Sequence, residues 1–332
     1  MTHQNDELIE RLLLDAETNS MCLLPPSPAI SRALRRRLGT TVVSPLPGMF
    51  VRKSTWQELD KAQRHRMIVR TLAALHPDWV FCSFSAACLW GLEVSWKYLD
   101  LVHVCSHTKP TTRKPAHIKR YRIEPQETAI AEGVNVTPLL QTVVDCLLAT
   151  GFTDGMPIAD SALGALGLDR DALSEGVEHR QTARQMLEVA TALKTLEYAD
   201  AQAESGGESV ARAVMIQTGF APDALQYKLI DPFDSKHILR NDFAWEHMAA
   251  LLTLGELDGF AKYTNEKMLA GKTTAEALVA ERQREAHLSV YGHPLVRFTM
   301  RDVRTPGVLA SILQTAGIRQ TPLPPWLGEI NL

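Results

Sequence analysis

Residues 225–263 read LQYKLIDPFDSKHILRNDFAWEHMAALLTLGELDGFAKY. Residues 225–230 alternate in polarity, as a half-buried strand does, and residues 238–245 form a second candidate strand. Residues 249–256 form a third candidate strand, with a continuous apolar run that is typical of a central strand covered on both faces. This stretch predicts three successive strands and determines the fold that we expect for the second half of the chain.

The segments on either side extend this pattern. A helix is expected to open within residues 203–209 and to run to about Gly219, where Ala221-Pro222 breaks it. After the strands, we expect a long amphipathic helix over 274–291, a strand over 295–299 and a last helix over 305–316. The expected order of elements is α-β-β-β-α-β-α.

Acidic residues stand at informative positions in this order. Glu208 lies in the first helix, Asp242 in the second strand, Glu256 at the end of the third, and Asp258 and Lys262 follow. Carboxylates on neighbouring strands can lie about 4–5 Å apart, and two anionic groups that close require a cation between them. Mg²⁺ is the expected cation, with Mn²⁺ as a substitute, because it prefers oxygen ligands and keeps positions open for water and phosphate.

A metal ion held there would lower the pKa of bound water and stabilise the pentavalent phosphate. This chemistry predicts phosphodiester hydrolysis, the reaction of a nuclease. Asp242, Glu256 and Glu208 are the expected metal ligands, and Lys262 is expected to orient the water or offset developing charge. Each acid taken alone is more commonly a solvated strand end or helix face.

Five blocks of this half resemble a known family. They are ESGGESVAR (204–212), LQYKLI (225–230), ILRNDFAW (238–245), LGELDGFAKY (254–263) and ERQREAHLSVYGHPLVRFT (281–299). In order and spacing they resemble endonuclease-like domains related to very-short-patch mismatch repair nucleases, which have the PD-(D/E)XK restriction-endonuclease fold, over about residues 203–316. The resemblance implies that Glu208 is the first-helix acid, Gln226 a strand glutamine, Asp242 the metal-binding aspartate and Glu256 the second acid. Glu281, Arg284, Gly292 and Arg297 match the later blocks.

One departure from that pattern leaves two alternatives open. The fold's standard motif is Glu-x-Lys, whereas this chain has Glu256-Leu257-Asp258. In the related subfamily the motif is Glu-x-Asp-Gly-x-x-His, and Lys262 stands at the position of that His. Lys262 could therefore supply the missing positive charge, or the domain could have kept the fold and lost the activity.

Charge is distributed unevenly along the chain. Residues 29–122 hold 17 Lys and Arg and five Asp and Glu, a balance of +12, so that the remainder stands at −15 within a total of −3. Such asymmetry favours a basic module that contacts a polyanion, joined to an acidic module with another role. The alternative is two solvated surfaces of opposite sign.

Residues 27–53, SPAISRALRRRLGTTVVSPLPGMFVRK, predict a helix followed by a short hairpin. Ser27 suits the N-cap, Pro28 the first helical turn, and Gly39 the end of the helix. Residues 41–43 and 49–51 are the two strands expected around a Pro-Leu-Pro-Gly turn. This is the order of a recognition helix and wing, which predicts DNA binding; a solvated charged helix is the alternative. The candidate DNA contacts are Arg32, Arg35 and Arg36 on one helix face, with Arg52 and Lys53.

Further elements are expected before residue 170. They are a helix over 56–75, a strand over 79–82, a helix over 83–91, strands over 99–104 and 117–123, and a helix over 137–150. The ordered segments PLPGMFVRK, FSAACLWGL, LVHV and VNVTPLLQTVVDCL resemble the N-terminal half of AbiE-type antitoxins over about residues 25–170. The resemblance implies a winged helix that binds DNA as an autorepressor or target-recognition module.

The length and composition of the chain predict a soluble, multidomain protein of the α+β or α/β class. The expected parts are a winged helix (1–75), a small α/β domain (76–170), a helical connector (171–202), the endonuclease-like domain (203–318) and a tail (319–332). No run of 18 apolar residues occurs, the first residues do not resemble a signal peptide, and the five cysteines form no CxxC pair. A cytoplasmic protein with reduced, buried thiols and no membrane association is expected.

Two functions follow from the sequence. One is a winged helix that delivers a Mg²⁺-dependent endonuclease domain to DNA. The other is an antitoxin-like autorepressor whose nuclease-derived domain is inactive and contacts a partner, either a toxin or a second copy of the chain.

Overall fold

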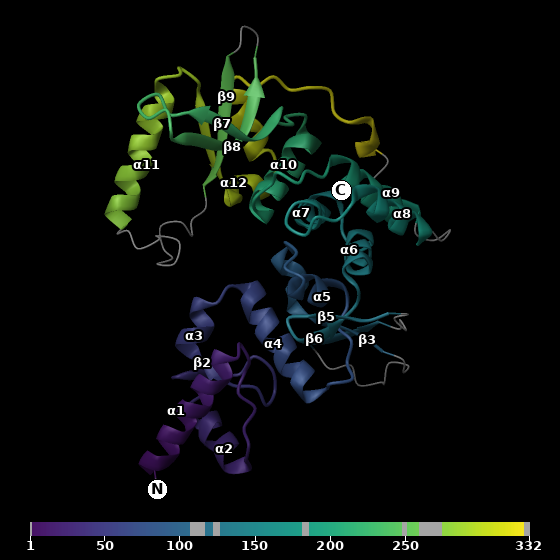
Figure 1. The fold of residues 1–332 in the computed structure, drawn as a ribbon, viewed down its shortest axis with the longest axis vertical. Helices are drawn as coiled ribbons and strands as arrows, with labels where there is room; N and C mark the ends of the chain where they lie inside the picture. The colour runs from purple at the N-terminus through teal and green to yellow at the C-terminus, as the bar shows by residue number, and fades with distance from the viewer. Residues whose placement is uncertain are drawn as a thin grey trace. The chain divides into compact units, whose positions relative to one another are not determined.

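The computed structural model describes residues 2–106, 117–121, 127–180, 186–247, 251–258 and 274–328, and within them the chain is a mixed α+β protein. It divides into two compact units, residues 1–146 and 147–332, each of which is described by itself (Figure 1). The segment expected as one small domain, 76–170, is shared between the two units. None of the helices in the described ranges is long and apolar enough to cross a membrane.

The first unit begins with a helical and hairpin layer and continues into a second α/β layer. Its elements are α1 (Thr2–Thr18), α2 (Pro28–Arg36), β1 (Val42–Val43), β2 (Val51–Arg52), α3 (Lys53–Glu58), α4 (Lys61–Leu75), α5 (Ser83–Leu89), the 3-10 helix η1 (Trp96–Asp100), β3 (Val102–Cys105), β4 (Ile118–Tyr121), β5 (Ala129–Ala131), β6 (Val134–Val136) and α6 (Leu139–Leu148).

The helix and hairpin expected over 27–53 are confirmed. Ser27 caps α2 by accepting a hydrogen bond from the backbone N–H of Ile30 at 3.3 Å, and Pro28 is the first helical residue. Strands β1 and β2 pair antiparallel. Ile30 and Leu34 of α2 pack with Ile9 and Leu13 of α1 in one core, so α1 holds the helix and the hairpin together.

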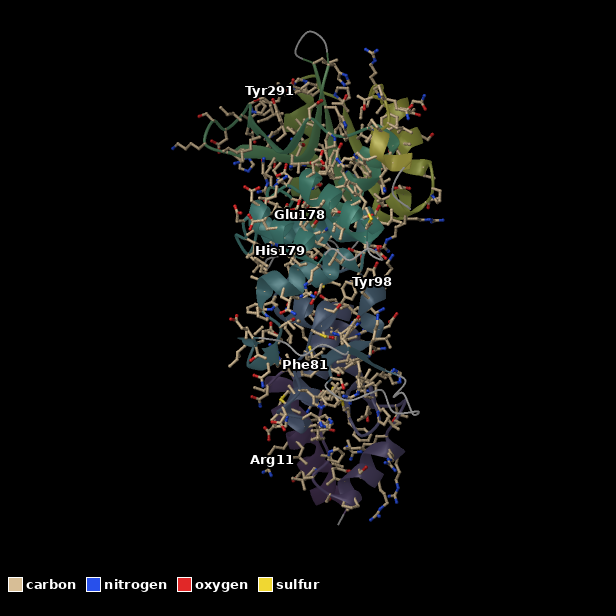
Figure 2. All side chains as sticks on the ribbon, turned by 90° about the vertical axis from the view of Figure 1, so that its right-hand side faces the viewer. Arg11, Phe81, Tyr98, Glu178, His179 and Tyr291 are labelled. Atoms are coloured by element: carbon tan, nitrogen blue, oxygen red, sulfur yellow. The ribbon has the colours of Figure 1, made fainter. Side chains whose placement is uncertain are left out.

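Three expectations for the first unit were wrong in detail. The helix expected over 56–75 is two helices, because Asp60 and Gln63 form a capping box that starts α4. The strand expected over 79–82 is reduced to Phe81, which makes isolated bridges to Val104 and Val136 from the interior of the unit (Figure 2). The strand expected from residue 99 starts at Val102, after η1. All five cysteines are free and buried, as expected.

The second unit contains a four-stranded sheet. Its elements are α7 (Phe152–Leu163), α8 (Arg170–His179), α9 (Met186–Tyr198), α10 (Gly206–Thr218), β7 (Ala224–Ile230), β8 (Ile238–Glu246), β9 (Leu252–Asp258), α11 (Thr274–Ser289), β10 (Leu295–Thr299), α12 (Met300–Arg304), α13 (Val308–Thr315) and the 3-10 helix η4 (Pro325–Gly328). From α10 onwards the expected order α-β-β-β-α-β-α is confirmed, with the short helix α12 inserted before the last helix.

The sheet is covered on both faces. Its strand order is β10-β9-β8-β7, with β7, β8 and β9 antiparallel and β10 parallel to β9. One face packs on α10, α12 and α13 through Phe243, Trp245 and Phe298. The other face packs on α11 through Leu254 and Leu288, so that α11 and α10 lie on opposite sides of the sheet (Figure 1). This two-sided cover explains the apolar run that identified β9.

Helices α7, α8 and α9 belong to the same unit as the sheet. Helix α7 packs against both α9 and α10, so the segment 171–202, expected as a connector, forms part of this packed layer. Trp326 from the expected tail is buried beside Phe152 of α7, with ring centroids 4.8 Å apart. The sequence did not predict α7, and it left open whether the tail docks or stays loose.

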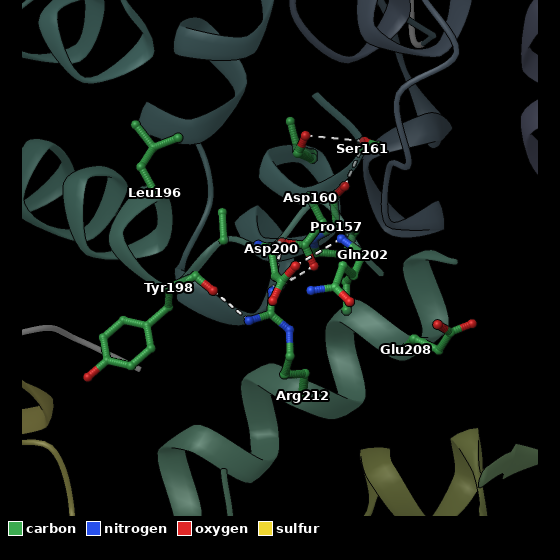
Figure 3. Close-up of polar contacts among 12 residues, drawn as sticks. Pro157, Asp160, Ser161, Leu196, Tyr198, Asp200, Gln202, Glu208 and Arg212 are labelled. Carbon is green, nitrogen blue, oxygen red and sulfur yellow. Dashed lines mark hydrogen bonds and ion pairs between the residues drawn. The ribbon is translucent and has the colours of Figure 1, made fainter. Parts of the chain in front are cut away.

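A buried ion pair joins α7 to α10 (Figure 3). Arg212 donates to both carboxylate oxygens of Asp160 at 2.7 and 2.8 Å, and the backbone N–H of Asp200 donates to Asp160 at 2.7 Å. The exposed fractions of the Arg212 and Asp160 side chains are 7% and 1%. Since neither charge is accessible to water, each depends on the other for compensation.

Replacement of Asp160 by Ala should lower the free energy of unfolding by about 3–5 kcal/mol, because Arg212 would remain buried without its partner. Glu197→Ala provides the control, since it breaks the exposed Lys194–Glu197 pair and should change stability by no more than about 1 kcal/mol. Urea denaturation of both variants measures the difference. Equal destabilisation of the two variants would contradict the role of the buried pair.

Candidate functional site

Glu208 is held at the start of α10 by the cap of that helix. Ser205 is the N-cap residue; its hydroxyl accepts from the Glu208 N–H at 3.2 Å and donates to Glu208 Oε1 at 2.7 Å. The N–H of Glu204 donates to Oε2 at 3.1 Å. A carboxylate in the first turn is also stabilised by the helix dipole. The carboxylate of Glu208 is directed away from the Asp160–Arg212 pair further along the helix (Figure 3).

Gln226 of β7 reaches the same carboxylate. Its side-chain amide donates to Glu208 Oε2 at 2.8 Å, and its Oε1 atom is buried with no hydrogen-bond partner among the described residues. The backbone φ of Gln226 is +49°, in the left-handed region that residues other than glycine and asparagine rarely occupy. Leu225 and Tyr227 pack on opposite faces of the sheet although they are two residues apart, so the alternation of the strand is broken at Gln226.

The site residues form a row across the sheet. Leu225 pairs with Phe243 and Tyr227 with Asn241, which puts Gln226 across from Asp242. Phe243 and Gly255 are the last pair of the β8–β9 ladder, and Asp242 and Glu256 are the next residues on the two strands. Glu256 in turn pairs with Arg297. Gln226, Asp242, Glu256 and Arg297 therefore stand near the same level of four adjacent strands, although Glu256 contacts Arg284 of α11 whereas Gln226 contacts Glu208 of α10.

Asp242 stands where the β8–β9 ladder ends. Its Oδ2 atom accepts a hydrogen bond from the backbone N–H of Leu257 at 2.9 Å. The side chain of Asp242 thus takes the place of a backbone carbonyl as the acceptor where the ladder ends. Burial raises the pKa of Glu208, and the nearby negative charge of Asp242 raises it further, against the hydrogen bonds from Ser205, Glu204 and Gln226. Ionised Glu208 is therefore disfavoured in the folded state. The contribution of Glu208 to the free energy of unfolding is present below the pKa of this group in the unfolded chain. It is lost as the pH rises through the higher pKa of Glu208 in the folded protein.

Glu256 is engaged by two arginines. Arg284 of α11 pairs with Glu256 Oε1, and Arg297 of β10 pairs with Oε2 at 2.8 Å. Only 11% of the Glu256 side chain is exposed. Both oxygens of the expected metal ligand are thus occupied by guanidinium groups.

Arg297 is the centre of a larger charge cluster. Besides Glu256, it pairs with Glu281, with Glu285 at 3.2 Å and with Asp258 at 3.7 Å. Burial lowers the pKa of Arg297, but the hydrogen bond that Arg297 donates to Glu281 and the charges of Glu256, Glu281 and Asp258 outweigh burial and raise it above its usual value. Arg297 is therefore charged at every pH at which the protein is folded.

The expected site residues thus divide into two groups. Glu208 and Asp242 lie together with Gln226, whereas Glu256 and Asp258 lie in the arginine cluster. Lys262 lies outside the described residues. Gly292 has a φ of +69° and ends the turn after α11. The sequence pointed to Glu281, Arg284 and Arg297 through the resemblance, but it gave no indication that the two arginines bind Glu256.

The donor atoms of the first group are oxygens, the type of ligand that a hard divalent cation prefers. No group of three or more His, Cys, Asp and Glu suited to a metal occurs within the described ranges. Two carboxylates and the unpartnered Oε1 of Gln226 nevertheless supply oxygen ligands, the type that Mg²⁺ prefers. A cation there would also relieve the repulsion that raises the pKa of Glu208.

The expected DNA contacts also divide into two groups. Arg32, Arg35 and Arg36 of α2 are exposed, and none pairs with an acid in the part of the chain that the structure describes. Arg52 is bound by Glu10 and by Glu17 of α1, at 3.1 and 2.9 Å. Lys53 donates to the carbonyl oxygen of Gly39 at 3.0 Å.

Comparison of this chain with protein-family models, with curated proteins and with solved structures finds no match. The function of the chain is therefore inferred from the geometry of its own residues.

Proposed function

We propose that this chain is a DNA-binding protein whose second unit is a metal-dependent endonuclease of the PD-(D/E)XK type. One observation carries the proposal: Asp242 and Glu256 directly follow the last pair of the β8–β9 ladder, and the charge of Asp242 acts on Glu208 of α10. Acids from three elements near one level of an α-β-β-β-α-β core are the arrangement that the resemblance implies.

In this proposal Mg²⁺ is held by Glu208 and Asp242, with Gln226 Oε1 as a further oxygen ligand. The bound ion would lower the pKa of a water molecule and offset charge on the phosphate. The protein's own contribution is to hold the ligands rigidly. Ser205 and Gln226 orient the carboxylate of Glu208, and the N–H of Leu257 orients that of Asp242. Lys262, which follows β9, remains the candidate for offsetting charge near the phosphate.

Purified full-length protein should cleave DNA in the presence of Mg²⁺ or Mn²⁺, and Asp242→Ala should reduce the rate at least about a hundredfold. Loss of a metal ligand removes several kcal/mol of transition-state stabilisation, and 1.36 kcal/mol corresponds to a factor of about ten. Plasmid nicking and cleavage of single-stranded and duplex oligonucleotides are the assays.

Asp223→Ala is the matched control, because Asp223 also accepts a backbone N–H, that of Glu246, at 2.8 Å but makes no recorded contact with Glu208. Equal cutting by wild type and Asp242→Ala, or no cutting of any substrate by wild type, would refute the nuclease proposal.

In this proposal α2 of the first unit is the recognition helix of a winged helix and binds the DNA. Acids of α1 neutralise the neighbouring arginines: Asp6 and Glu10 pair with Arg37, and Glu10 and Glu17 pair with Arg52. Among the described residues of this region, Arg32, Arg35 and Arg36 of α2 are exposed and pair with no acid. Exposed guanidinium groups on one helix are suited to phosphate contacts and release condensed counterions on binding.

Replacement of Arg32, Arg35 and Arg36 together by Ala should weaken DNA binding and reduce the slope of log affinity against log salt concentration by up to about 0.9 per lost phosphate contact. The control replaces Lys61, Arg66 and Arg70 of α4 by Ala, which removes the same charge from residues that pair with Asp100 and Glu132. Fluorescence anisotropy at several salt concentrations compares the two. If both triple variants lose affinity equally, net charge rather than α2 determines binding.

A second candidate function is an antitoxin-like transcriptional repressor without nuclease activity. Occupation of both oxygens of Glu256 by arginines, and Asp258 at the usual lysine position, favour it. Its partner would be a toxin or a second copy of the chain. This candidate shares the DNA-binding role of α2 and predicts that wild-type protein binds its DNA without cutting it.

A further inference from the structure

We propose that the first unit holds one unpaired nucleotide of DNA, with the base in a cavity that Trp79 lines and the phosphate bound by His76 and Arg120, which lie against the same ring. The inference rests on the proposed function, since it adds a second DNA contact to that of α2.

An open cavity of about 670 Å³ lies between three segments of the first unit. The residues that line it come from the end of α1 and the turn after it (18–21), from α4 and the segment after it (within 70–79), and from the β5–β6 hairpin (132–135). Ligand cavities in proteins measure about 300–1,000 Å³. This one therefore has room for a base with its sugar.

The lining of the cavity combines apolar and polar groups, as the faces and the edge of a base require. Its apolar residues are Met21, Ala73, Ala74, Pro77, Trp79 and Val134. Asn135 donates one amide hydrogen to the carbonyl oxygen of Pro77 at 3.0 Å, which fixes the side chain. The Oδ1 atom and the second amide hydrogen have no hydrogen-bond partner among the described residues. An amide presents a donor beside an acceptor, the pattern with which proteins recognise the edge of a base.

The charged groups of the cavity do not repel a nucleotide. Among the described residues that line it, Arg70 and Glu132 are charged, and they pair at 2.6 Å. Arg66 of α4 lies 3.6 Å from the other carboxylate oxygen of Glu132. Two arginines against one acid leave a positive balance, which favours a ligand that carries a phosphate.

Trp79 holds two basic side chains beside the cavity. The imidazole of His76 stacks on its ring, with centroids 3.9 Å apart and planes inclined by 8°. The guanidinium carbon of Arg120 lies over the same ring, 4.7 Å from the centroid. Both side chains are exposed, and neither forms an ion pair within the described ranges. The ring therefore orients two groups that can donate hydrogen bonds.

This arrangement favours a phosphate next to Trp79. A guanidinium group stacks on an aromatic ring through its face and binds phosphate through its N–H groups, so the contact with Trp79 leaves the donors of Arg120 available. The acid nearest to Trp79 in the sequence is Asp78, which is exposed. The neighbouring cations Lys119 and Arg120 of β4 outweigh its charge.

The cavity selects an unpaired nucleotide. Bases in a duplex are stacked and paired, and a base that has already lost its partner leaves the stack at the lowest cost. In the proposed function α2 contacts phosphates, which every duplex offers. The cavity therefore adds a preference for DNA that contains an unpaired base.

A different role for Arg120 would give a different result. Strand β4 forms one side of the two-stranded sheet β3-β4, and charged residues protect such strands from pairing with other chains. If Arg120 served only this purpose, its removal would not change the preference of the protein for one DNA over another.

The test is fluorescence anisotropy of the full-length protein with a perfect DNA duplex and with the same duplex carrying one bulged thymidine. Wild type should bind the bulged duplex about tenfold more tightly, within the range that stacking of one base contributes. Ala74→Trp, which fills the cavity from an exposed position of α4, and Arg120→Gln should each remove most of this preference. Lys97→Gln is the matched control, because Lys97 also lies over an aromatic ring, that of Tyr98 at 5.2 Å, but does not line the cavity.

Thermal denaturation of each variant establishes that it is folded, and Lys97→Gln should keep the preference of wild type. Equal affinity of wild type for the two duplexes, or a preference that either folded variant retains in full, would overturn the nucleotide pocket. Binding of both duplexes without preference leaves the role of α2 intact. Binding of the bulged duplex alone, abolished by Ala74→Trp, would refute the role of α2 and support the pocket.

Discussion

Burial of the Glu208 carboxylate at the start of α10 is the constraint on which the candidate site of the second unit depends. Glu208 is fixed by the cap of α10 and by Gln226, and the negative charge of Asp242 contributes to its raised pKa. Neither acid is needed to close the apolar core, which is built from other side chains of the same elements. In the proposed function a cation compensates the charges of these two groups.

Arginines are used in opposite ways in the two units. In the first unit, the acids of α1 bind Arg37 and Arg52 and so leave the unpaired charge on α2. In the second, Arg284 and Arg297 are surrounded by carboxylates, of which Glu256 is the most buried. Two arginines and four acids leave this cluster with a net negative charge, which explains why DNA binding is assigned to the first unit and the chemistry to the second.

The order of elements in the second unit could be predicted because alternation, an apolar run and the N-cap Ser205 are local features of the sequence. The split between α3 and α4 was missed although the capping residues Asp60 and Gln63 are equally local. The register that puts Gln226, Asp242 and Glu256 near one level could not be predicted, since it depends on an irregular backbone at Gln226. The pairing of Glu256 with Arg284 also depends on which side of α11 meets the sheet.

The most direct measurement is a crystal structure of the full-length protein grown with Mn²⁺, with anomalous diffraction recorded to locate the ion. We predict one strong anomalous peak between Glu208 and Asp242, within coordinating distance of both carboxylates and of Gln226 Oε1, with Glu256 still bound to Arg284 and Arg297. Absence of a peak at saturating Mn²⁺, or a peak bound by Glu256 with the arginine pairs intact, would contradict it.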